Sequence, residues 1–288
     1  MKIIPLASDS LGTRSMATYI ETENINILID PAVALSPSRF NLPPHPLELK
    51  RKEEQLNLIK EKAELSSIII ITHYHYDHHN PEEISLYQNK ILLIKDPENF
   101  INESQKIRAG YFLEKIKEIP KKIEIADNKE FSMENIKIKF SPPVRHGPKE
   151  YLGYVIQILI SNEKEKFIFT SDVQGIVDEE QLNFILENPP TILYADGPMT
   201  YMLNYRYKKE DLEISLNNIK KIINETDVKT IILDHHLTRD ENFKEYLKEI
   251  LNQNKTKILT AAEYVGKENE LLEAKRRELY KEFYYLYK

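Results

Sequence analysis

The stretch SSIIIITHYHYDHHNPEE, residues 66–83, constrains the fold more than any other part of this 288-residue chain. Its four isoleucines, Ile68–Ile71, are apolar on both faces of an extended backbone, which is typical of a strand buried between two layers. Four of the chain's eight histidines follow at once. Asn80 as N-cap and Pro81 at the first helical position then predict a helix over about 81–88. The histidines therefore occupy a predicted loop at the carboxyl end of a strand, where ligand sites collect in α/β sheets.

The spacing of these polar residues indicates metal binding. His73 and His75 stand two residues apart, so both side chains can converge on one point from extended backbone. Asp77 and His78 are adjacent and diverge, so they can serve a second point. The alternative is a solvated polar turn. The chain has no cysteine, and neutral imidazoles with carboxylates are the ligands that zinc takes when thiolates are absent.

Three later stretches supply further candidate ligands, each directly after a predicted strand. His146 lies among prolines and glycine in SPPVRHGPK, which indicates a loop. Asp172 ends FIFTSD, where the alternative role is the N-cap of the next helix. TIILDHH ends on Asp234, His235 and His236, and one of the two histidines is expected to bind metal. Together with the first cluster, these residues fit two metal sites better than one.

Strands and helices alternate along most of the chain, which predicts an α/β fold. The strand-like runs are 2–6, 16–22, 25–30, 68–72, 91–94, 136–140, 154–160, 166–170, 191–195, 230–234 and 257–260. The helix-like runs are 47–64, 81–88, 98–117, 178–187, 209–224, 240–252 and 267–287. No stretch resembles an interdomain linker. We therefore predict a single domain over 1–288, with a charged Pro-rich insertion at about 35–65 and an aromatic-rich C-terminal helix at about 267–287.

Composition excludes several classes of protein. The net charge of −6 disfavours a chain whose main role is wrapping nucleic acid, because phosphate neutralisation dominates such binding. No segment approaches the roughly 18 apolar residues that span a bilayer, so no membrane partner is expected. Asp9 interrupts the short apolar start, which therefore does not resemble a signal peptide. With no cysteine either, the expected location is the cytoplasm.

The ordered ligand motifs resemble those of the metallo-β-lactamase superfamily: His73-x-His75-x-Asp77-His78, then His146, Asp172 and His235. NILIDPAVA, with Asp30 at a strand end, resembles the first motif of that superfamily, and the resemblance spans roughly residues 1–260. It implies an αβ/βα sandwich, in which two mixed β-sheets lie face to face with helices on the outer faces. LASDSLGTRSMATYIET, LPPHPLELKR and YADGPMTYML resemble an archaeal family within the superfamily, and this narrower resemblance supplies no substrate.

The resemblance implies two divalent cations. The implied ligands are His73, His75 and His146 for the first metal, Asp77, His78 and His235 for the second, and Asp172 as the bridge. His235 aligns with the single histidine of the last motif, which leaves His236 as a supporting or proton-transfer group. Flavodiiron relatives place a glutamate where His75 stands, so zinc is expected, with manganese and iron as alternatives. The thiolate variant of the β-lactam hydrolases is excluded because cysteine is absent.

The reaction that the resemblance implies is hydrolysis by a hydroxide shared between the two cations, with Asp77, Asp172 and His236 as catalytic residues. The first hypothesis is a phosphodiesterase acting on a nucleotide or nucleic acid, although the basic character and long inserted domain of the RNA-cleaving relatives are missing. It predicts cations beside the metals, and the candidates are Arg14, Arg39, Arg145, Lys149 and Arg239.

Two other functions compete with the first. An acyl hydrolase acting on a lactone or thioester predicts an aromatic-lined pocket, for which the candidates are Tyr74, Tyr76, Tyr151 and Tyr201. A non-catalytic protein with an inherited metal or ligand site predicts bound metal without turnover.

Two peripheral stretches complete the predictions. Residues 39–55 precede the metal-binding loop and are expected to form a structural cover rather than a lid. Near the C-terminus, Tyr280, Phe283, Tyr284 and Tyr287 recur at helical spacing. Such a stripe is predicted to pack on the chain's own core, and a homodimer contact is the alternative.

Overall fold

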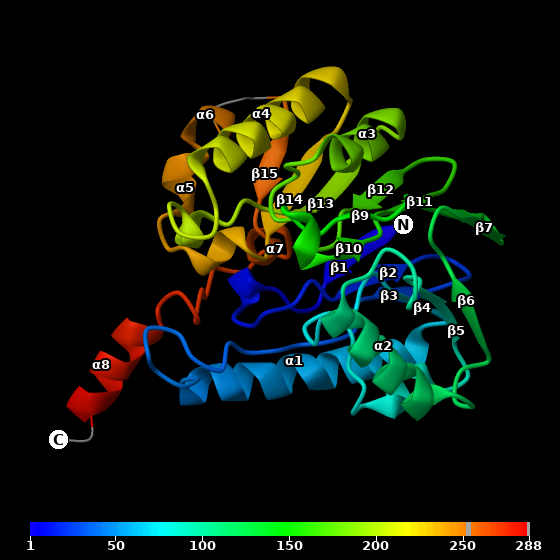
Figure 1. Cartoon of the computed structure of the whole chain (residues 1–288), viewed down its shortest axis with the longest axis horizontal. Coiled ribbons are helices and arrows are strands. Elements are labelled where there is room, and N and C mark those ends of the chain that lie inside the picture. The colour runs from blue at the N-terminus through cyan, green and yellow to red at the C-terminus, as the bar shows by residue number, and fades with distance from the viewer. Residues whose placement is uncertain (252–254, 287–288) are drawn as a thin grey trace.

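Two mixed β-sheets lie face to face, with helices on the outer side of each (Figure 1). The computed structural model describes residues 1–251 and 255–286. This arrangement confirms the predicted αβ/βα sandwich.

The first sheet has the strand order β1-β2-β3-β4-β5-β6. Strands β1 to β3 pair antiparallel, and β3 to β6 pair parallel. Its strands are β1 (Lys2–Pro5), β2 (Thr18–Glu21), β3 (Ile27–Ile29), β4 (Ile68–Ile71), β5 (Ile91–Ile94) and β6 (Lys122–Ile125).

The second sheet has the order β15-β14-β13-β12-β11-β8-β7, antiparallel from β7 to β12 and parallel from β12 to β15. A separate hairpin of β9 (Val144–Arg145) and β10 (Tyr154–Val155) lies beside the ligand loops. The strands of the second sheet are β7 (Glu130–Met133), β8 (Ile136–Phe140), β11 (Ile158–Ser161), β12 (Lys166–Phe169), β13 (Ile192–Asp196), β14 (Thr230–Asp234) and β15 (Lys257–Leu259).

The four isoleucines of β4 divide between two cores. Ile68 and Ile70 lie in the core between the sheets, whereas Ile69 and Ile71 lie beneath α1 (Pro46–Leu65) and α2 (Glu103–Ile116). Successive side chains of a strand point to opposite faces, so a strand covered on both sides must be apolar throughout. The prediction of a buried strand is therefore confirmed.

Helices α3 (Glu179–Glu187) and α4 (Lys209–Glu225) cover the outer face of the second sheet, as Figure 1 shows. Side-chain capping defines the first turn of several helices: Asp178 and Gln181 form a capping box at α3, and the Asn102 side chain accepts from the backbone N–H of Gln105 at α2. The remaining helices are α5 (Phe243–Tyr246), α6 (Lys248–Leu251), α7 (Ala261–Tyr264) and α8 (Arg276–Leu286).

The helix predicted over 81–88 is wrong, and only a short 3-10 helix, Ile84–Tyr87, forms there. The Asn80 side chain does accept backbone N–H groups, from Glu82 at 3.0 Å and from Glu83 at 3.3 Å. These bonds close a local turn instead of starting an α-helix. Asparagine competes with helix formation in this way because its short side chain satisfies nearby backbone donors.

Other boundaries also differ from the predictions. The run 98–117 is helical only from Glu103, because the Asp96 carboxylate holds residues 98–99 in a turn. The run 154–160 divides between β10 and β11, and the run 240–252 between α5 and α6, with residue 252 outside the described residues. Three strands were missed: β6, β7 and β9. The first two are charged and lie at or near sheet edges, where one apolar face suffices.

The C-terminal helix predicted over 267–287 begins only at Arg276, and α8 extends away from the two sheets (Figure 1). Tyr280 contacts the segment before α1: its hydroxyl donates to the Pro44 carbonyl at 3.3 Å. The side chains of Phe283, Tyr284 and Tyr287 lie outside the part of the chain that the structure describes. The packing of the aromatic stripe therefore stays a prediction, as does the homodimer alternative.

The stretch 35–65 consists of an irregular loop followed by α1. Pro46 is the first residue of α1, and His45 with Glu48 forms its capping box. None of the helices in the described part of the chain is both long and apolar enough to cross a bilayer.

A buried ion pair fixes the start of α8 to the start of α1. The Arg276 guanidinium donates to the Glu48 carboxylate at 2.7 and 2.8 Å and to the carbonyls of Ser36 and Leu42. Arg276→Ala should lower the free energy of unfolding by about 3–5 kcal/mol, because it leaves Glu48 as an uncompensated buried charge. Urea denaturation measures this change. Exposed Lys281 on the same helix is the control, and a loss no larger than that of Lys281→Ala would contradict the role of the pair.

Candidate metal centre

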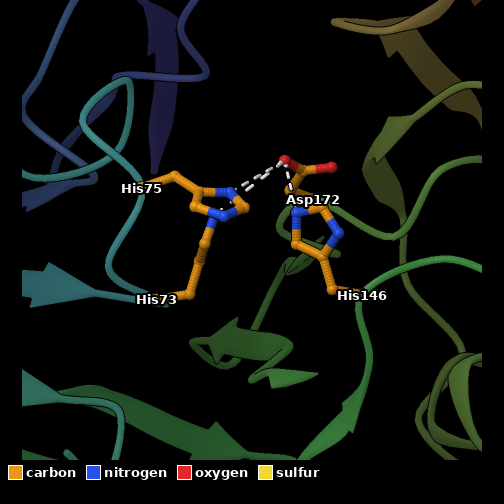
Figure 2. Close-up of side chains that lie close together, drawn as sticks. All are labelled: His73, His75, His146 and Asp172. Carbon is orange, nitrogen blue, oxygen red and sulfur yellow. Dashed lines mark ion pairs between the residues drawn. The ribbon is translucent and has the colours of Figure 1, made fainter. Parts of the chain in front are cut away.

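Four strand ends bring the predicted ligands together. His73 and His75 follow β4, and His146 follows the short strand β9. Asp172 follows β12, and His235 follows β14. Figure 2 shows His73 and His75 from one loop and His146 from another, all pointing toward the Asp172 carboxylate. The loop after β4 and the loop after β12 are joined directly, because the hydroxyls of Thr72 and Ser171 are 2.6 Å apart.

One oxygen, Asp172 Oδ2, is the centre of this cluster. Five imidazole nitrogens lie around it: His146 Nε2 at 2.8 Å, His235 Nε2 at 3.7 Å, and His73 Nε2, His75 Nδ1 and His78 Nε2 at 3.9 Å. Two nitrogen or oxygen atoms bound to one zinc at about 2.0–2.2 Å lie at most about 4 Å apart. The spacing of the ligand atoms therefore suits metal binding on either side of Asp172.

The side chains divide into two principal groups whose potential ligand atoms lie within 4.8 Å of one another. One group is His73, His75, His146 and Asp172; the other is Asp77, His78 and His235. Asp172 also lies within this distance of His235 and His236. Asp30, His73 and His78 form a further such group that overlaps the first two, so the division into two metal sites stays a prediction.

The donor atoms fit a metal rather than a hydrogen-bonded core. Among the described residues, Nε2 of His73 and Nε2 of His78 are buried and have no hydrogen-bond partner. Burying a polar atom without a partner costs about 1–3 kcal/mol, so two such atoms facing one carboxylate require an explanation. A cation shared with Asp172 would supply the missing interaction.

The pKa values of the candidate ligands shift in different directions. Burial would lower the pKa of His146 and of His235, but Asp172 beside the first and Asp9 beside the second outweigh it and raise both pKa values. Burial, reinforced by neighbouring His78 and His75, holds the pKa of His73 well below its usual range. Burial alone would raise the pKa of Asp172, but His146 and His236 outweigh it and hold that pKa well below the usual range. A neutral imidazole and an ionised carboxylate are the forms that bind cations.

Two buried carboxylates orient the histidines of the second group. Asp30 Oδ2 lies 2.8 Å from Nδ1 of His78, and Asp9 Oδ2 lies 2.8 Å from Nδ1 of His235. Such a contact fixes the ring and leaves Nε2 for the metal. Asp30 was expected at a strand end. Asp9 was missed, although its place in a polar loop soon after an apolar strand was a usable signal.

The pair of adjacent histidines after β14 divides its roles. His235 points Nε2 toward Asp172 and toward Asp77, at 3.7 and 3.8 Å. His236 instead places Nδ1 3.0 Å from Asp196 Oδ2 and 3.2 Å from Asp172 Oδ1. Asp234 accepts the backbone N–H groups of Ser10, His235 and Ala261, so its role is structural.

Asp172 does not cap the helix that follows it. Asp178 is the N-cap of α3, six residues further along the chain. Between them, Gly175 adopts φ +107°, and an added Cβ would lie 2.9 Å from the Pro198 Cα and 2.7 Å from Ser215 Oγ. Only glycine fits this close approach, which lets the chain leave the site sharply after Asp172.

The fourth histidine of the first loop, His79, faces away from the metal ligands. Its Nδ1 lies 2.9 Å from the His75 carbonyl oxygen, and its ring packs against Tyr74, Tyr76 and Phe112. Burial lowers its pKa to about 4. His79 therefore serves packing in the neutral form.

A cavity of about 960 Å³ opens over the cluster. Five cations line it: Arg14, Arg108, Lys149, Arg206 and Arg239. Among the described residues that line the cavity, the only carboxylates are Asp77 and Asp172, both candidate ligands. Three aromatic side chains, Tyr76, Tyr151 and Tyr201, and two methionines also line it.

Some predicted cavity residues lie elsewhere. Tyr74 is buried and donates to the Lys95 carbonyl, so its assignment to the pocket is wrong. Arg145 pairs with Asp178, and the Arg39 guanidinium lies 4.7 Å from the centre of the Tyr201 ring. Sequence reasoning missed Arg108 and Arg206, which lie in a helix and a loop far along the chain from the ligand motifs.

The two-sheet sandwich and its strand-end cluster of histidines and aspartates define a protein of the metallo-β-lactamase fold. Three solved structures share the fold. An isothiocyanate hydrolase from Delia radicum gut bacteria has a TM-score of 0.56, is 16% identical and covers 90% of this chain and 95% of its own. The second is the metallo-β-lactamase fold protein YhfI from Bacillus subtilis, and the third is Tm1679, a metal-dependent hydrolase of the β-lactamase superfamily. Each has a TM-score of 0.52 and is 13% identical, and each match covers 90% of this chain and 94% of the other chain.

Sequence comparison then identifies the family. No protein-family model matches the chain. A UPF0282 protein of Korarchaeum cryptofilum is 47% identical over 284 residues, which cover 97% of this chain and 94% of the relative. A UPF0282 protein of Saccharolobus solfataricus is 46% identical over 289 residues, which cover 98% of this chain and 94% of the relative. The chain belongs to the UPF0282 family, and the predicted resemblance to an archaeal family of this superfamily is confirmed.

The depressed pKa of His79 predicts a pH-dependent stability. The unfolded state binds a proton on this residue near pH 6.5, and the folded state only near pH 4. The stabilising contribution is therefore complete above pH 6.5 and is lost as the pH falls toward 4, by an amount on the order of 3 kcal/mol. Urea unfolding of wild-type protein and of His79→Phe across this range measures the difference. If the free energy of unfolding fell equally in the two proteins between pH 6.5 and pH 4, the pH dependence could not be assigned to His79.

Proposed function

We propose that this protein is a metal-dependent phosphodiesterase that holds two divalent cations, zinc in the first instance, and acts on a nucleotide or nucleic-acid substrate. The observation that carries the proposal is the charge of the cavity over the cluster. Five cationic side chains line it, and the only carboxylates among its described lining residues are candidate ligands. Such a cavity attracts an anionic substrate more strongly than a neutral one.

The candidate ligands have assigned tasks in this proposal. His73, His75 and His146 would hold one cation, Asp77, His78 and His235 the other, and Asp172 would contact both. Cations held there would polarise the phosphoryl group and acidify a water molecule. Manganese and iron are the alternative metals, because the ligands are nitrogen and oxygen atoms without a thiolate.

The surrounding side chains would bind and orient the substrate. Arg239 is held by Asp9, to which its Nε donates at 2.7 Å, and it lines the cavity beside Asp77. A guanidinium fixed in this way presents its remaining N–H groups to phosphoryl oxygens without losing side-chain entropy on binding. Arg14 is likewise fixed, by Glu273 at 2.6 and 2.7 Å.

His236 is the residue proposed to deliver a proton to the leaving group. It lines the cavity, and Asp196 holds Nδ1, which fixes the orientation of the ring. Its backbone N–H also donates to Asp196 at 3.0 Å. This double contact with Asp196 fixes the ring, whose Nδ1 also lies 3.2 Å from Asp172 Oδ1, and leaves Nε2 for proton transfer.

An acyl hydrolase acting on a lactone or thioester is the second candidate. The apolar part of the cavity favours it: Met199, Met202, Tyr76 and Tyr201 lie among the lining residues. The five cations make it the weaker candidate, because a neutral ester needs none of them. A non-catalytic protein would bind metal at the same residues without turnover of either substrate class.

Hydrolysis of bis(p-nitrophenyl) phosphate by zinc- or manganese-loaded protein tests the proposal. Asp172→Ala should reduce turnover by at least about a hundredfold, because the Asp172 carboxylate lies next to both groups of candidate ligands. Asp211→Ala, which changes a capping carboxylate at the start of α4, is the control and should keep full activity. Metal content is measured on the same samples. Absence of turnover from fully loaded protein would reject the phosphodiesterase in favour of lactones or thioesters.

The role of His236 predicts a dependence on the leaving group. His236→Ala should slow cleavage of a dinucleotide, whose alkoxide leaving group needs a proton, by about 10²–10⁴-fold. The same variant should slow hydrolysis of bis(p-nitrophenyl) phosphate far less, because p-nitrophenolate leaves without needing a proton. Asp196→Asn should shift the rates in the same direction to a smaller extent. Equal losses on both substrates would show that His236 acts on metal binding instead.

A further inference from the structure

Resting on the proposed phosphodiesterase function, we infer that the mouth of the cavity binds a single-stranded nucleic acid, with bases stacked on exposed tyrosines and phosphates bound by the cations beside them. The proposal narrows the substrate to a polynucleotide strand and excludes a lone mononucleotide or a duplex as the preferred ligand.

The most exposed tyrosines of the described chain gather at this cavity. Tyr76 is 51% exposed, Tyr151 is 71% exposed and Tyr205 is 77% exposed. Tyr76 and Tyr151 line the cavity, and Tyr205 directly precedes the lining residue Arg206. Aromatic rings left in water at the mouth of a candidate catalytic cavity are surfaces on which a ligand can stack.

Each of these rings lies beside a cation. The Arg108 guanidinium carbon is 5.3 Å from the centre of the Tyr76 ring, Lys149 Nζ is 5.7 Å from that of Tyr151, and the Arg206 guanidinium carbon is 5.5 Å from that of Tyr205. All three cations line the cavity. Nucleic-acid strands are bound by this combination, since a base stacks on the ring while the neighbouring cation meets the phosphate.

In the described part of the chain, the cations beside the exposed tyrosines have no carboxylate partner, unlike the other two cations that line the cavity. Arg14 and Arg239 are neutralised by Glu273 and Asp9. Within the described residues, Arg108, Lys149 and Arg206 have no carboxylate within 4.0 Å, and Arg108 instead donates to the Tyr74 carbonyl and the Ser104 hydroxyl. Their charge is therefore free to bind an anion that comes from outside the chain.

The three pairs belong to separate segments, which sets the size of the ligand. Tyr76 lies in the loop after β4, Tyr151 in the 3-10 helix Glu150–Leu152, and Tyr205 after the 3-10 helix Thr200–Met202. A mononucleotide has one base and can occupy only one of these rings. A duplex keeps its bases stacked inside, so the rings would have no partner. A flexible single strand can meet several of them together.

The net charge of −6 does not oppose this proposal. Binding of a short strand depends on the local field at the cavity, and a cleft of one charge focuses that field even in a protein of the opposite net charge. An acidic remainder of the surface would instead restrict the strand to the cavity.

The test uses a fluorescein-labelled 12-nucleotide oligo(dT), measured by anisotropy with metal-loaded Asp172→Asn protein so that the strand stays uncut. Tyr151→Ala and Tyr76→Ala should each weaken binding by about tenfold, and Tyr151→Phe should restore it because the ring face is kept. Lys149→Gln should reduce the slope of log Kd against log salt by about 0.7. The duplex of the same strand should bind at least about tenfold more weakly than the single strand.

Tyr111 provides a matched control. It is 46% exposed and its ring centre lies 4.7 Å from Lys115 Nζ, but Lys115 is paired with Glu82 at 2.6 Å, and Tyr111 is on α2 and does not line the cavity. Tyr111→Ala should leave the affinity unchanged. An equal loss for Tyr111→Ala and Tyr151→Ala, or equal affinity for duplex and single strand, would overturn the proposal.

The two proposals fail separately. Hydrolysis of bis(p-nitrophenyl) phosphate without tyrosine-dependent binding of oligo(dT) would reject the strand-binding surface and keep the phosphodiesterase. Tyrosine-dependent binding without hydrolysis of either phosphodiester would reject the phosphodiesterase and support the surface as a binding site.

Discussion

The buried carboxylate of Asp172 is the contact on which the arrangement of the site depends. It reaches imidazoles from three other loops, and those loops leave both sheets. The sheets must therefore meet at a fixed separation at this edge. The core between them supplies it, since Ile68 and Ile70 of β4 pack in the same cluster as Phe167 and Phe169 of β12. The Thr72–Ser171 hydroxyl contact then joins the two strand ends directly beside the ligands.

Rigidity in the surrounding residues comes from carboxylates rather than from apolar packing. Asp30, Asp9 and Asp196 each contact Nδ1 of one histidine, and all three are buried. A buried carboxylate is stable only when its oxygens have partners, and here backbone N–H groups and a guanidinium complete the set. The histidine rings are thus held before any cation arrives, which reduces the entropy lost on metal binding.

The ligand residues could be predicted from sequence because their spacing is local. His73 and His75 stand two residues apart after β4, and Asp172 and His235 each follow an apolar strand. Arg108 could not be assigned in this way, because it reaches the site through tertiary packing of a distant helix. Local rules also failed at Asn80, where the side chain closed a turn instead of capping a helix. Patterns with a short period thus identified the candidate ligands, and the long-range contacts around them required the structure.

The cavity combines a fixed half with an adaptable half. On the side of Asp77 and His235, carboxylates hold Arg14 and Arg239 in place, so their geometry is set before a substrate binds. On the side of His75 and His146, Tyr76 and Tyr151 are exposed and their neighbouring cations are free of carboxylates. Chemistry needs positions held within a fraction of an ångström, whereas recognition of a flexible ligand tolerates movement. The division therefore separates the part of the site that would react from the part that would select, within a single cavity.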